Sequence, residues 1–413
     1  MTETKTTQNI YLSNKQLIRL AQKYSTPLYV YDGNLIKQRY HELLNCFPYK
    51  KTKLFYAMKA NYNLAVLKLL EQEGANIDAV SPGDIYLAMQ AGFTKERILF
   101  TANMMTDEEI HEVQTLGVLF NIGSLSELER YGKFYPHNKV CIRFNPDVVA
   151  GFHKNVRTGG KDTKFGIFLH HLEQVKAISK KYDLTIIGIH EHTGSGIPET
   201  VDLMAGFRNI LNIVKKEHFP ELQFVDFGGG FKVPYQPAEQ RIDYTAFGKT
   251  AVELFTKASR EFGRELAIYF EPGRYLVAEA GILLVTATTI KTDGKNIAGT
   301  NSGFPQLIRP MFYDAYHHIV NLTNPTGTKK FYDVAGNICE TGDYFATNRE
   351  LPEIRENDLL AIQNAGAYCY SMGGVYNLRA MPAEVMVLNG KDKLVRKRLS
   401  SKELVEEIVG ESV

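Results

Sequence analysis

The feature that most constrains the fold is a regular alternation of short apolar runs with helical patterns between residues 53 and 272. The runs typical of buried strands are KLFYAMK (53–59), NIDAV (76–80), RILFTA (97–102), VLFNIG (118–123), KVCIRFN (139–145), TIIGIHEH (185–192), QFVDFGG (223–229) and LAIYFEP (266–272). The first five begin about 21 residues apart, close to a minimal strand–loop–helix unit. Eight such units predict a closed parallel (β/α)8 TIM barrel, with an open doubly wound sheet as the alternative.

Helical patterns lie between these runs, for example NLAVLKLLEQEG (63–74) and SPGDIYLAMQAG (81–92). In the second, Ser81 can cap the helix, Pro82 suits its first turn and Gly92 suits its end. The later repeats are longer, and the stretch 150–166 is rich in glycine and lysine. We expect this stretch to be an insertion or an active-site loop.

After about residue 276 the pattern changes to strands without intervening helices. These strands are GILLVTATTIKT (281–292), KKFYDVAGNI (329–338) and PAEVMVLNG (382–390). TPLYVYD (26–32) is a further strand that precedes the barrel and can pair with them. We therefore expect a barrel domain at 34–276 and a mostly β, β-barrel-like domain formed by 1–33 with 277–413.

Length and composition are those of a soluble globular protein. The 413 residues favour two domains, and 44% of them are hydrophobic and 23% charged. A net charge of +2 gives no reason to expect nucleic acid or a membrane as partner. The basic run KDKLVRKR (391–398) is better explained as a solvated hairpin than as a binding patch. No apolar run reaches the ~20 residues of a membrane span.

The four cysteines, Cys46, Cys141, Cys339 and Cys369, are scattered and form no CxxC pair. This spacing argues against a zinc site and against a disulfide framework. The first nine residues, MTETKTTQN, lack the apolar region of a signal peptide. A cytoplasmic location is expected.

A lysine in the apolar run FYAMKAN (55–61) is the most unusual residue of the predicted barrel. If Lys59 is buried, its charge is costly unless it is paired or neutralised. Chemistry in such barrels sits at the carboxyl ends of the strands, where Lys59, His192, GGG (228–230) and EPGR (271–274) all fall. Each alone could be a snorkelling lysine, a turn glycine or a surface ion pair, but their shared position favours a site.

The glycines of HTGSG (192–196) and FGGGF (227–231) allow positive φ angles and a close approach of backbone to ligand. Backbone N–H groups in such turns can bind phosphate. Ser195 adds a hydroxyl and Arg274 a cation, so a phosphate monoester is the expected ligand. The alternative for the glycine triplet alone is an ordinary turn between strand and helix.

A phosphate site and a lysine on one rim suggest pyridoxal 5'-phosphate (PLP), because a desolvated, neutral lysine can form a Schiff base. Glu271 could keep the pyridine nitrogen protonated, and His192 could stack on the ring. His190 and His192 share one face of their strand, but the spacing shows no third metal ligand. We expect no metal.

The motifs FYAMKAN, HEHTGSG, DFGGGF, EPGR, CETGD (339–343) and GAY (366–368) resemble, in this order, the fold-type III, alanine-racemase-like PLP decarboxylases. The resemblance runs from about residue 25 to about residue 390. LIRPMFYDAYHHI (307–319) and YNLRAMPAEVMV (376–387) look most like the branch that converts meso-2,6-diaminopimelate to L-lysine and CO2. That branch performs the last step of lysine biosynthesis.

The resemblance implies a role for each matched residue. Lys59 would form the Schiff base and His192 would stack on the cofactor, whose phosphate and pyridine nitrogen would be bound by Ser195, Gly229, Gly230, Arg274, Tyr368 and Glu271. The distal carboxylate of the substrate would be held by Arg309, Tyr313 and Arg274, with Tyr368 also near the substrate. Glu340 would bind the distal ammonium, and Cys339 would be the general acid. Because Cys339 and Glu340 reach the partner's cofactor in this family, a homodimer is implied.

Other readings remain for single residues and for the substrate. Cys339 could be an ordinary buried cysteine, Glu340 and Asp343 a solvated turn, and Tyr368 and Tyr376 core aromatics. Three segments depart from the family pattern. HEHTGSGI has Gly196 where HxHxGSQ has glutamine, the usual VSGGE appears as VSPGD (80–84), and the segment before LIRP, which usually resembles DAGMND, reads TNSGFPQ (300–306).

The rival functions are a decarboxylase of the same fold acting on arginine, ornithine or a carboxylated polyamine, a non-catalytic PLP carrier, a racemase and a barrel hydrolase. Arg309 argues against the ornithine and arginine enzymes. The residues after 276 argue against the carrier, and the Cys339–Glu340 pair argues against the racemase. A hydrolase that uses paired carboxylates would leave Lys59 unexplained.

Overall fold

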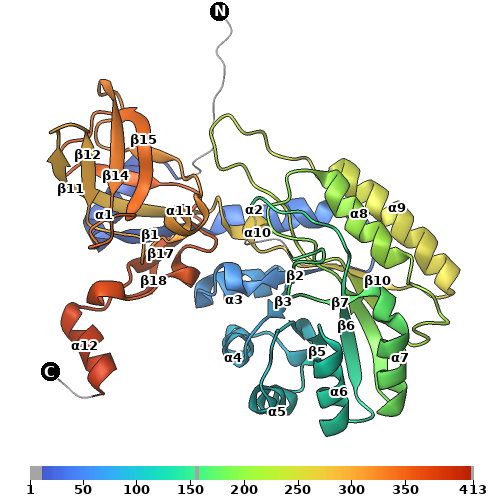
Figure 1. Ribbon diagram of the computed structural model, residues 1–413. Coiled ribbons are helices and arrows are strands. Elements are labelled where there is room, and N and C mark those ends of the chain that lie inside the picture. The colour runs from blue at the N-terminus through green and yellow to red at the C-terminus, as the bar shows by residue number, and fades with distance from the viewer. Residues whose placement is uncertain (1–11, 154–157, 411–413) are drawn as a thin grey trace, which may run out of the picture. The chain divides into compact units, whose positions relative to one another are not determined.

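The computed structural model describes residues 12–153 and 158–410 (Figure 1). The chain divides into two compact units, which we call the sheet unit (Met1–Lys37, Val233–Arg241 and Leu276–Val413) and the barrel unit (Gln38–Lys232 and Ile242–Tyr275). The predicted domain ranges, 34–276 and 1–33 with 277–413, stay a prediction. Unlike those ranges, the division assigns the segment 233–241 to the sheet unit.

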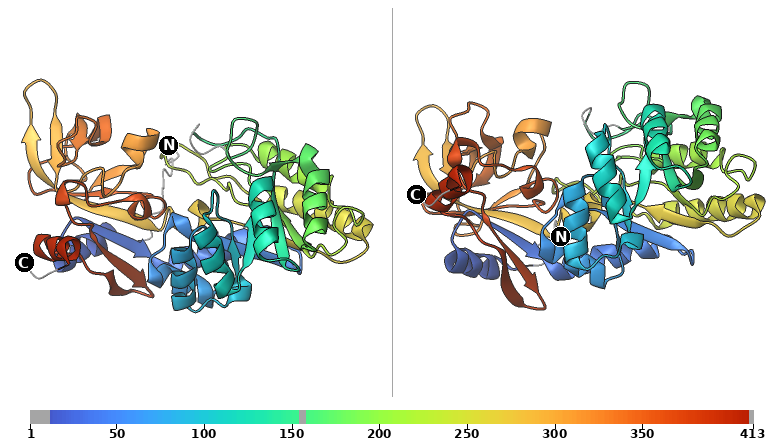
Figure 2. Two further views of the ribbon diagram at one scale, coloured as in Figure 1. Left: turned by 60° about the horizontal axis from the view of Figure 1, so that its bottom comes forward. Right: turned by 90° about the horizontal axis from the view of Figure 1, so that it is seen from below.

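Eight parallel strands form a closed barrel among the described residues of the barrel unit (Figure 2). They are β2 (Thr52–Ala57), β3 (Asn76–Ala79), β4 (Ile98–Phe100), β5 (Leu119–Ile122), β6 (Lys139–Asn145), β8 (Thr185–His190), β9 (Phe224–Asp226) and β10 (Ala267–Phe270). Strand β2 pairs with both β3 and β10, and β5 pairs with β6, so each strand has two neighbours. The predicted (β/α)8 barrel is confirmed, and the open sheet is excluded.

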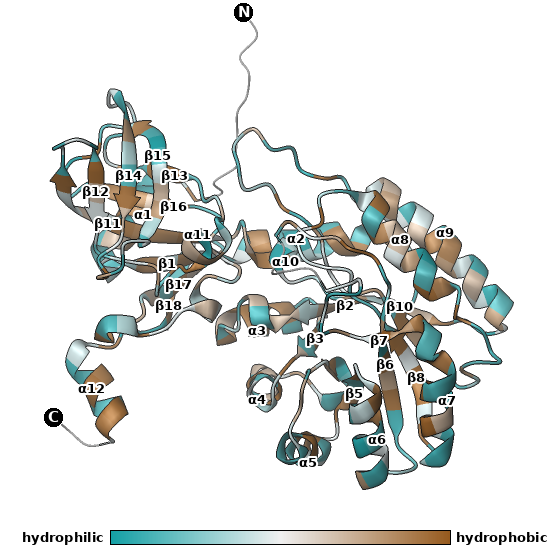
Figure 3. Cartoon of the chain, in the orientation of Figure 1, coloured by the Kyte–Doolittle hydropathy of each residue, from teal (hydrophilic) through white to brown (hydrophobic). Residues whose placement is uncertain are grey.

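Helices connect the barrel strands as the sequence predicts, and α2 (Gly33–Asn45) and α10 (Arg274–Val277) precede the first strand and follow the last. The connecting helices are α3 (Leu64–Gln72), α4 (Pro82–Ala91), α5 (Asp107–Leu116), α6 (Leu125–Phe134), α7 (Leu172–Lys181), α8 (Thr200–Leu211) and α9 (Thr245–Phe262), with single 3-10 turns η1 (Met58–Ala60), η2 (Lys95–Arg97) and η4 (Leu169–His171). Both α8 and α9 carry hydrophobic and hydrophilic residues (Figure 3). The buried residues of α9 include Phe247, Ala251 and Phe255, spaced four apart along one face.

The predicted ends of α4 are confirmed in detail. The side chain of Ser81 accepts a hydrogen bond from the backbone N–H of Asp84, and Pro82 occupies the first turn. Gly92 ends the helix with a φ of 107°, a conformation that costs a residue with a side chain more than it costs glycine.

The stretch between β6 and η4 differs from a plain connection. A two-residue strand, β7 (Ile167–Phe168), pairs with the end of β6 and was not predicted. The expected loop at 150–166 contains no helix or strand among its described residues, and residues 154–157 lie outside them. Asn145 holds the described end of this loop, because its Nδ2 donates to the carbonyl oxygens of Gly160 and Phe165 over 3.0 Å.

The sheet unit is built from nine strands among the residues described. They are β1 (Leu28–Asp32), β11 (Gly281–Lys291), β12 (Ile297–Thr300), β13 (Ile319–Asn321), β14 (Lys329–Ala335), β15 (Tyr344–Pro352), β16 (Leu359–Ile362), β17 (Ala383–Leu388) and β18 (Lys391–Arg396). Its helical elements are α1 (Asn14–Tyr24), α11 (Arg309–Tyr313), α12 (Ser401–Val409), η5 (Tyr370–Met372) and η6 (Tyr376–Leu378). The mostly β second domain predicted from the sequence is thus confirmed as a fold class.

Strand β1 lies in the middle of this sheet, antiparallel to β11 and parallel to β17. All five of its residues are buried because both faces of the strand are covered. Tyr29 and Tyr31 pack into one core cluster, and Leu28 and Val30 pack into another that also contains Leu17 of α1.

The basic run at 391–398 forms β18, which pairs with β17 as the predicted hairpin. All four cysteines are free thiols, and only Cys339 is exposed. Among the described residues, no helix combines the length and the apolar character needed to cross a membrane.

Candidate functional site at the carboxyl end of the barrel

Lys59 lies just beyond the end of β2, where the chain enters the single turn η1. Its side chain is 40% exposed, so the prediction of a buried lysine is wrong. The strand ends at Ala57, so Lys59 belongs to the turn and not to the strand. The amine of Lys59 forms an ion pair with the fully buried Asp78, which lies opposite Ala57 on the neighbouring strand β3. The carboxylate of Asp78 therefore compensates the positive charge of Lys59.

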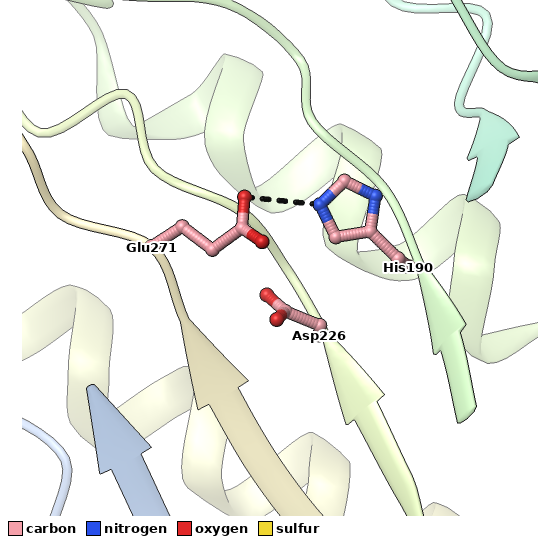
Figure 4. Close-up of side chains that lie close together, drawn as sticks. All are labelled: His190, Asp226 and Glu271. Carbon is pink, nitrogen blue, oxygen red and sulfur yellow. Dashed lines mark hydrogen bonds and ion pairs between the residues drawn. The ribbon is translucent and has the colours of Figure 1, made fainter. Parts of the chain in front are cut away.

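Three buried side chains converge beside this pair (Figure 4). His190 ends β8, Asp226 ends β9 and Glu271 follows β10, and Nε2 of His190 lies 3.1 Å from Oε2 of Glu271. One potential ligand atom from each of the three lies within 4.8 Å of the others. The sequence prediction concerned a third ligand for the pair His190 and His192, and His192 is not among these three residues. Asp226 and Glu271 come from adjoining strands, so the local sequence around His190 does not reveal them.

Burial dominates the electrostatics of this cluster. It raises the pKa of Asp78, of Asp226 and of Glu271, and the neighbouring Glu271 charge raises the pKa of Asp226 further. The positive charges of Lys59 and Arg143 oppose the shift at Glu271. Burial and Arg143 hold the pKa of His190 well below its usual range, so this imidazole is neutral near pH 7.

Next to the cluster, the two glycine loops and the EPGR segment are joined by hydrogen bonds. Nη2 of Arg274 donates to Oγ of Ser195 over 3.2 Å, so the structure brings together the two side chains expected to bind phosphate. The backbone N–H of Gly229 donates to Nδ1 of His192 over 3.0 Å, which assigns the proton of a neutral His192 to Nε2. We call Ser195, Gly229, Gly230 and Arg274 the candidate phosphate cradle.

The glycines of the candidate phosphate cradle are sterically required. A Cβ on Gly229 would lie 2.4 Å from the carbonyl oxygen of Glu271. Gly230 has a φ of +101°, and a Cβ there would lie 2.9 Å from the side chain of Ile197. These contacts explain why three glycines in a row follow β9.

The remaining predicted residues, Arg309, Tyr313, Cys339, Glu340 and Tyr368, belong to the sheet unit. Arg309 and Tyr313 begin and end the short helix α11. Arg309 is only 2% exposed, and its Nη1 donates to Nε2 of His317 over 2.9 Å. Tyr368 is half-buried and adopts a positive φ of 57°.

Cys339 and Glu340 are exposed neighbours on a turn, so the reading of Cys339 as a buried core cysteine is wrong. Sγ of Cys339 donates to Oδ1 of Asn377 over 3.4 Å, and the hydroxyl of Tyr376 donates to Oε1 of Glu340 over 3.2 Å. Asp343 is buried and anchors the turn, because its carboxylate accepts from the backbone N–H of Ile338 over 2.9 Å.

Sequence reasoning missed Asp78, Arg143 and Asp226, which complete the charge balance around Lys59 and Glu271. Each is a charged residue near the carboxyl end of an otherwise apolar strand, in NIDAV, KVCIRFN and QFVDFGG. This pattern could have identified them as site residues. A charged side chain at such a position is seldom buried in an apolar core, so it is expected at the mouth of the barrel.

The chain is similar to known proteins both in sequence and in structure. Residues 34–278 match the family model described as pyridoxal-dependent decarboxylase, pyridoxal binding domain. A diaminopimelate decarboxylase of Methanothermobacter thermautotrophicus is 41% identical over 405 residues, which cover 96% of this chain and 95% of that protein. The enzyme of the same name from Aquifex aeolicus is 34% identical over 406 residues, or 96% and 95% of the two chains. The crystal structure of diaminopimelate decarboxylase from Helicobacter pylori with L-lysine has a TM-score of 0.88 at 30% identity, covering 95% and 99%.

Proposed function

We propose that this chain, which belongs to the family of pyridoxal-dependent decarboxylases, converts meso-2,6-diaminopimelate to L-lysine and CO2. The observation that carries the proposal is the 41% identity to a diaminopimelate decarboxylase over nearly the full length of both chains. The identity extends through the sheet unit, which contains Arg309, Tyr313, Glu340 and Tyr368, four of the residues assigned to the substrate. The resemblance noted in the sequence is confirmed at the level of the family.

The residues of the barrel mouth fit PLP. Oε1 of Glu271 is buried and has no hydrogen-bond partner among the described residues, as expected of an oxygen that accepts a hydrogen bond from the pyridine N–H of the bound cofactor. The glycines leave the backbone of the candidate phosphate cradle open where a Cβ would collide. Lys59 supplies an amine at the same end of the barrel. Bound PLP supplies an electron sink for the electron pair left behind when CO2 departs.

Each group of the cofactor has a proposed partner in the chain. Lys59 would attach its aldehyde, His192 would lie against the ring, and Glu271 would hold a proton at the pyridine nitrogen. The phosphate would be bound by the candidate phosphate cradle together with Tyr368. Because burial raises the pKa of Glu271, the opposing charges of Lys59 and Arg143 help to keep its carboxylate ionised.

The residues that we propose to bind the substrate favour meso-diaminopimelate. Arg309 and Tyr313, with Arg274, would hold the distal carboxylate of meso-diaminopimelate, and Glu340 would hold its distal ammonium, with Tyr368 near the substrate. This binding would orient the scissile carboxylate. Lysine or ornithine lacks the distal carboxylate and would leave the nearly buried Arg309 without an anionic partner, at a cost of several kcal/mol.

Cys339 would donate the proton that replaces the lost carboxylate, in a site shared across a cytoplasmic homodimer. The exposure of the thiol and of Glu340 supports this role. Apolar side chains of the sheet unit are exposed in the neighbouring segments, which is typical of an interface: Met311, Phe312, Val375, Tyr376 and Leu378. Mixing Lys59→Ala with Cys339→Ala protein should restore part of the activity if the sites are shared. An unchanged, inactive mixture would contradict the shared site.

A spectrum of the purified protein with PLP and a CO2-release assay test the proposal. We expect a visible cofactor band and release of CO2 from meso-diaminopimelate, with far less from lysine, ornithine, arginine or a carboxylated polyamine. Lys59→Ala should abolish the band. Preference for one of the other amines would overturn the substrate, whereas a protein without the band would overturn the cofactor as well.

A further inference from the structure

Phe152 makes contacts in the barrel unit that the proposed function does not explain. It lies in the loop after β6, and its backbone N–H donates to the carbonyl oxygen of Ser195 over 3.2 Å. The centre of its ring lies 4.9 Å from Cζ of Arg274. The ring is 38% exposed, a large exposed fraction for an aromatic side chain, so burial in a core does not account for its position.

Thr158, in the same loop, also donates hydrogen bonds to the segment that precedes Ser195. Oγ of Thr158 donates to the carbonyl oxygen of His192 over 2.6 Å. The backbone N–H of Thr158 donates to the carbonyl oxygen of Thr193. The described residues of the loop therefore donate hydrogen bonds to the carbonyl oxygens of His192, Thr193 and Ser195, and Ser195 belongs to the candidate phosphate cradle.

Gly196 makes room for the aromatic ring. A Cβ on Gly196 would lie 2.8 Å from Cδ1 of Phe152, and its φ of +61° also favours glycine. Gly196 is the position at which this sequence departs from the family pattern, where glutamine is usual. A longer side chain and the present position of Phe152 exclude each other.

We propose that Phe152 is a positioning residue for the phosphate of the cofactor, acting through Arg274. An aromatic ring attracts a guanidinium through the face of the cation, whereas the N–H groups of the guanidinium donate in its plane. Nη2 of Arg274 already donates to Oγ of Ser195 in this orientation. The ring also displaces water from one face of the cation, which strengthens its attraction for a phosphate dianion. The inference rests on the proposed binding of PLP.

The test compares PLP with pyridoxal, which lacks the phosphate. We expect Phe152→Ala to weaken PLP binding and to speed PLP release about 10-fold, the middle of the range for a cation–π contact. Binding of pyridoxal should change less than twofold. Release is followed by loss of the visible band while a phosphatase consumes free PLP. Phe152→Tyr should keep the affinity of the wild type, and Phe331→Ala, at an exposed phenylalanine of the sheet unit, serves as matched control.

A double-mutant cycle tests the role of Gly196. Gly196→Gln should weaken PLP binding in the native background and do so less when combined with Phe152→Ala. Equal effects of Phe152→Ala on PLP and pyridoxal, or wild-type retention of PLP, would overturn the inference while leaving the proposed function intact. If the wild-type protein fails to bind PLP, both fail, and the spectrum alone reveals it.

Discussion

Nε2 of His190 lies 3.1 Å from Oε2 of Glu271, and both side chains are buried at the mouth of the barrel. This contact occupies one carboxylate oxygen of Glu271 and leaves the other, Oε1, without a partner among the described residues. The hydrogen bond thereby fixes the orientation of a carboxylate whose other oxygen we propose as the acceptor for the pyridine N–H. The relationship makes His190 a positioning residue for Glu271.

Replacing His190 tests that relationship. His190→Phe removes the hydrogen bond and should weaken PLP binding about 10-fold, the equivalent of one buried hydrogen bond to a charged group. His190→Gln keeps a donor and should lose less. Because the chain has no tryptophan, the affinity is measured from the visible band of the cofactor. Equal losses in the two variants would show that the hydrogen bond is not the cause.

The ion pair of Lys59 with Asp78 predicts a coupled effect on stability. Lys59→Ala leaves a buried carboxylate without its cation, and should lower the stability of the cofactor-free protein by ~1–3 kcal/mol, less than for a fully buried pair because Lys59 is partly exposed. Burial raises the pKa of Asp78, so the loss should grow as pH rises through that pKa.

The double variant Lys59→Ala with Asp78→Asn should recover most of the lost stability. Thermal unfolding of the three cofactor-free proteins between pH 5 and pH 8 provides the measurement. A double variant less stable than Lys59→Ala alone would contradict the pairing.

The buried carboxyl group of Glu191 predicts that the stability of the protein depends on pH in the neutral range. It is buried, it accepts a hydrogen bond from Oγ1 of Thr193 over 2.9 Å, and burial raises its pKa to about 8. A raised folded pKa means that the native protein binds more protons than the unfolded chain, so stability falls as pH rises from the ordinary glutamate pKa toward 8. Glu191→Gln keeps the acceptor and removes this loss. Its Tm should match the wild type near pH 4.5 and exceed it at pH 8, and parallel curves would contradict the assignment.

The carboxylate of Asp392 predicts the opposite dependence of stability on pH, and it does so at acidic pH. Hydrogen bonds from Lys23 and Tyr24 lower its pKa to about 2, and its side chain is only 8% exposed. A lowered folded pKa contributes stability that is present above pH 4 and lost as pH falls through about 2. Because Lys23 and Arg19 are more than half exposed, we expect Asp392→Asn to cost about 1 kcal/mol at pH 7. The difference in Tm should shrink between pH 4 and pH 2.

Local patterns in the chain were sufficient to predict the barrel strands, the ends of α4 and the hairpin at 391–396. Apolar periodicity and capping residues act over a few positions, so they can be recognised without knowing which strands become neighbours. The motifs near strand ends likewise pointed to Lys59, Glu271 and Arg274, because all parallel strands of a barrel present their carboxyl ends at one rim.

Only the tertiary structure decided which side chains meet at that rim. Asp78 pairs with Lys59, and Asp226 joins His190 and Glu271, because hydrogen-bonded parallel strands place residues far apart in sequence side by side. The exposure of Lys59 depended on where β2 ends, which periodicity does not resolve to the residue. The position of Phe152 beside Gly196 could not be predicted either. The two residues are 44 positions apart, and their contact depends on strand pairing and on the path of the loop, neither of which is encoded in a short stretch of the chain.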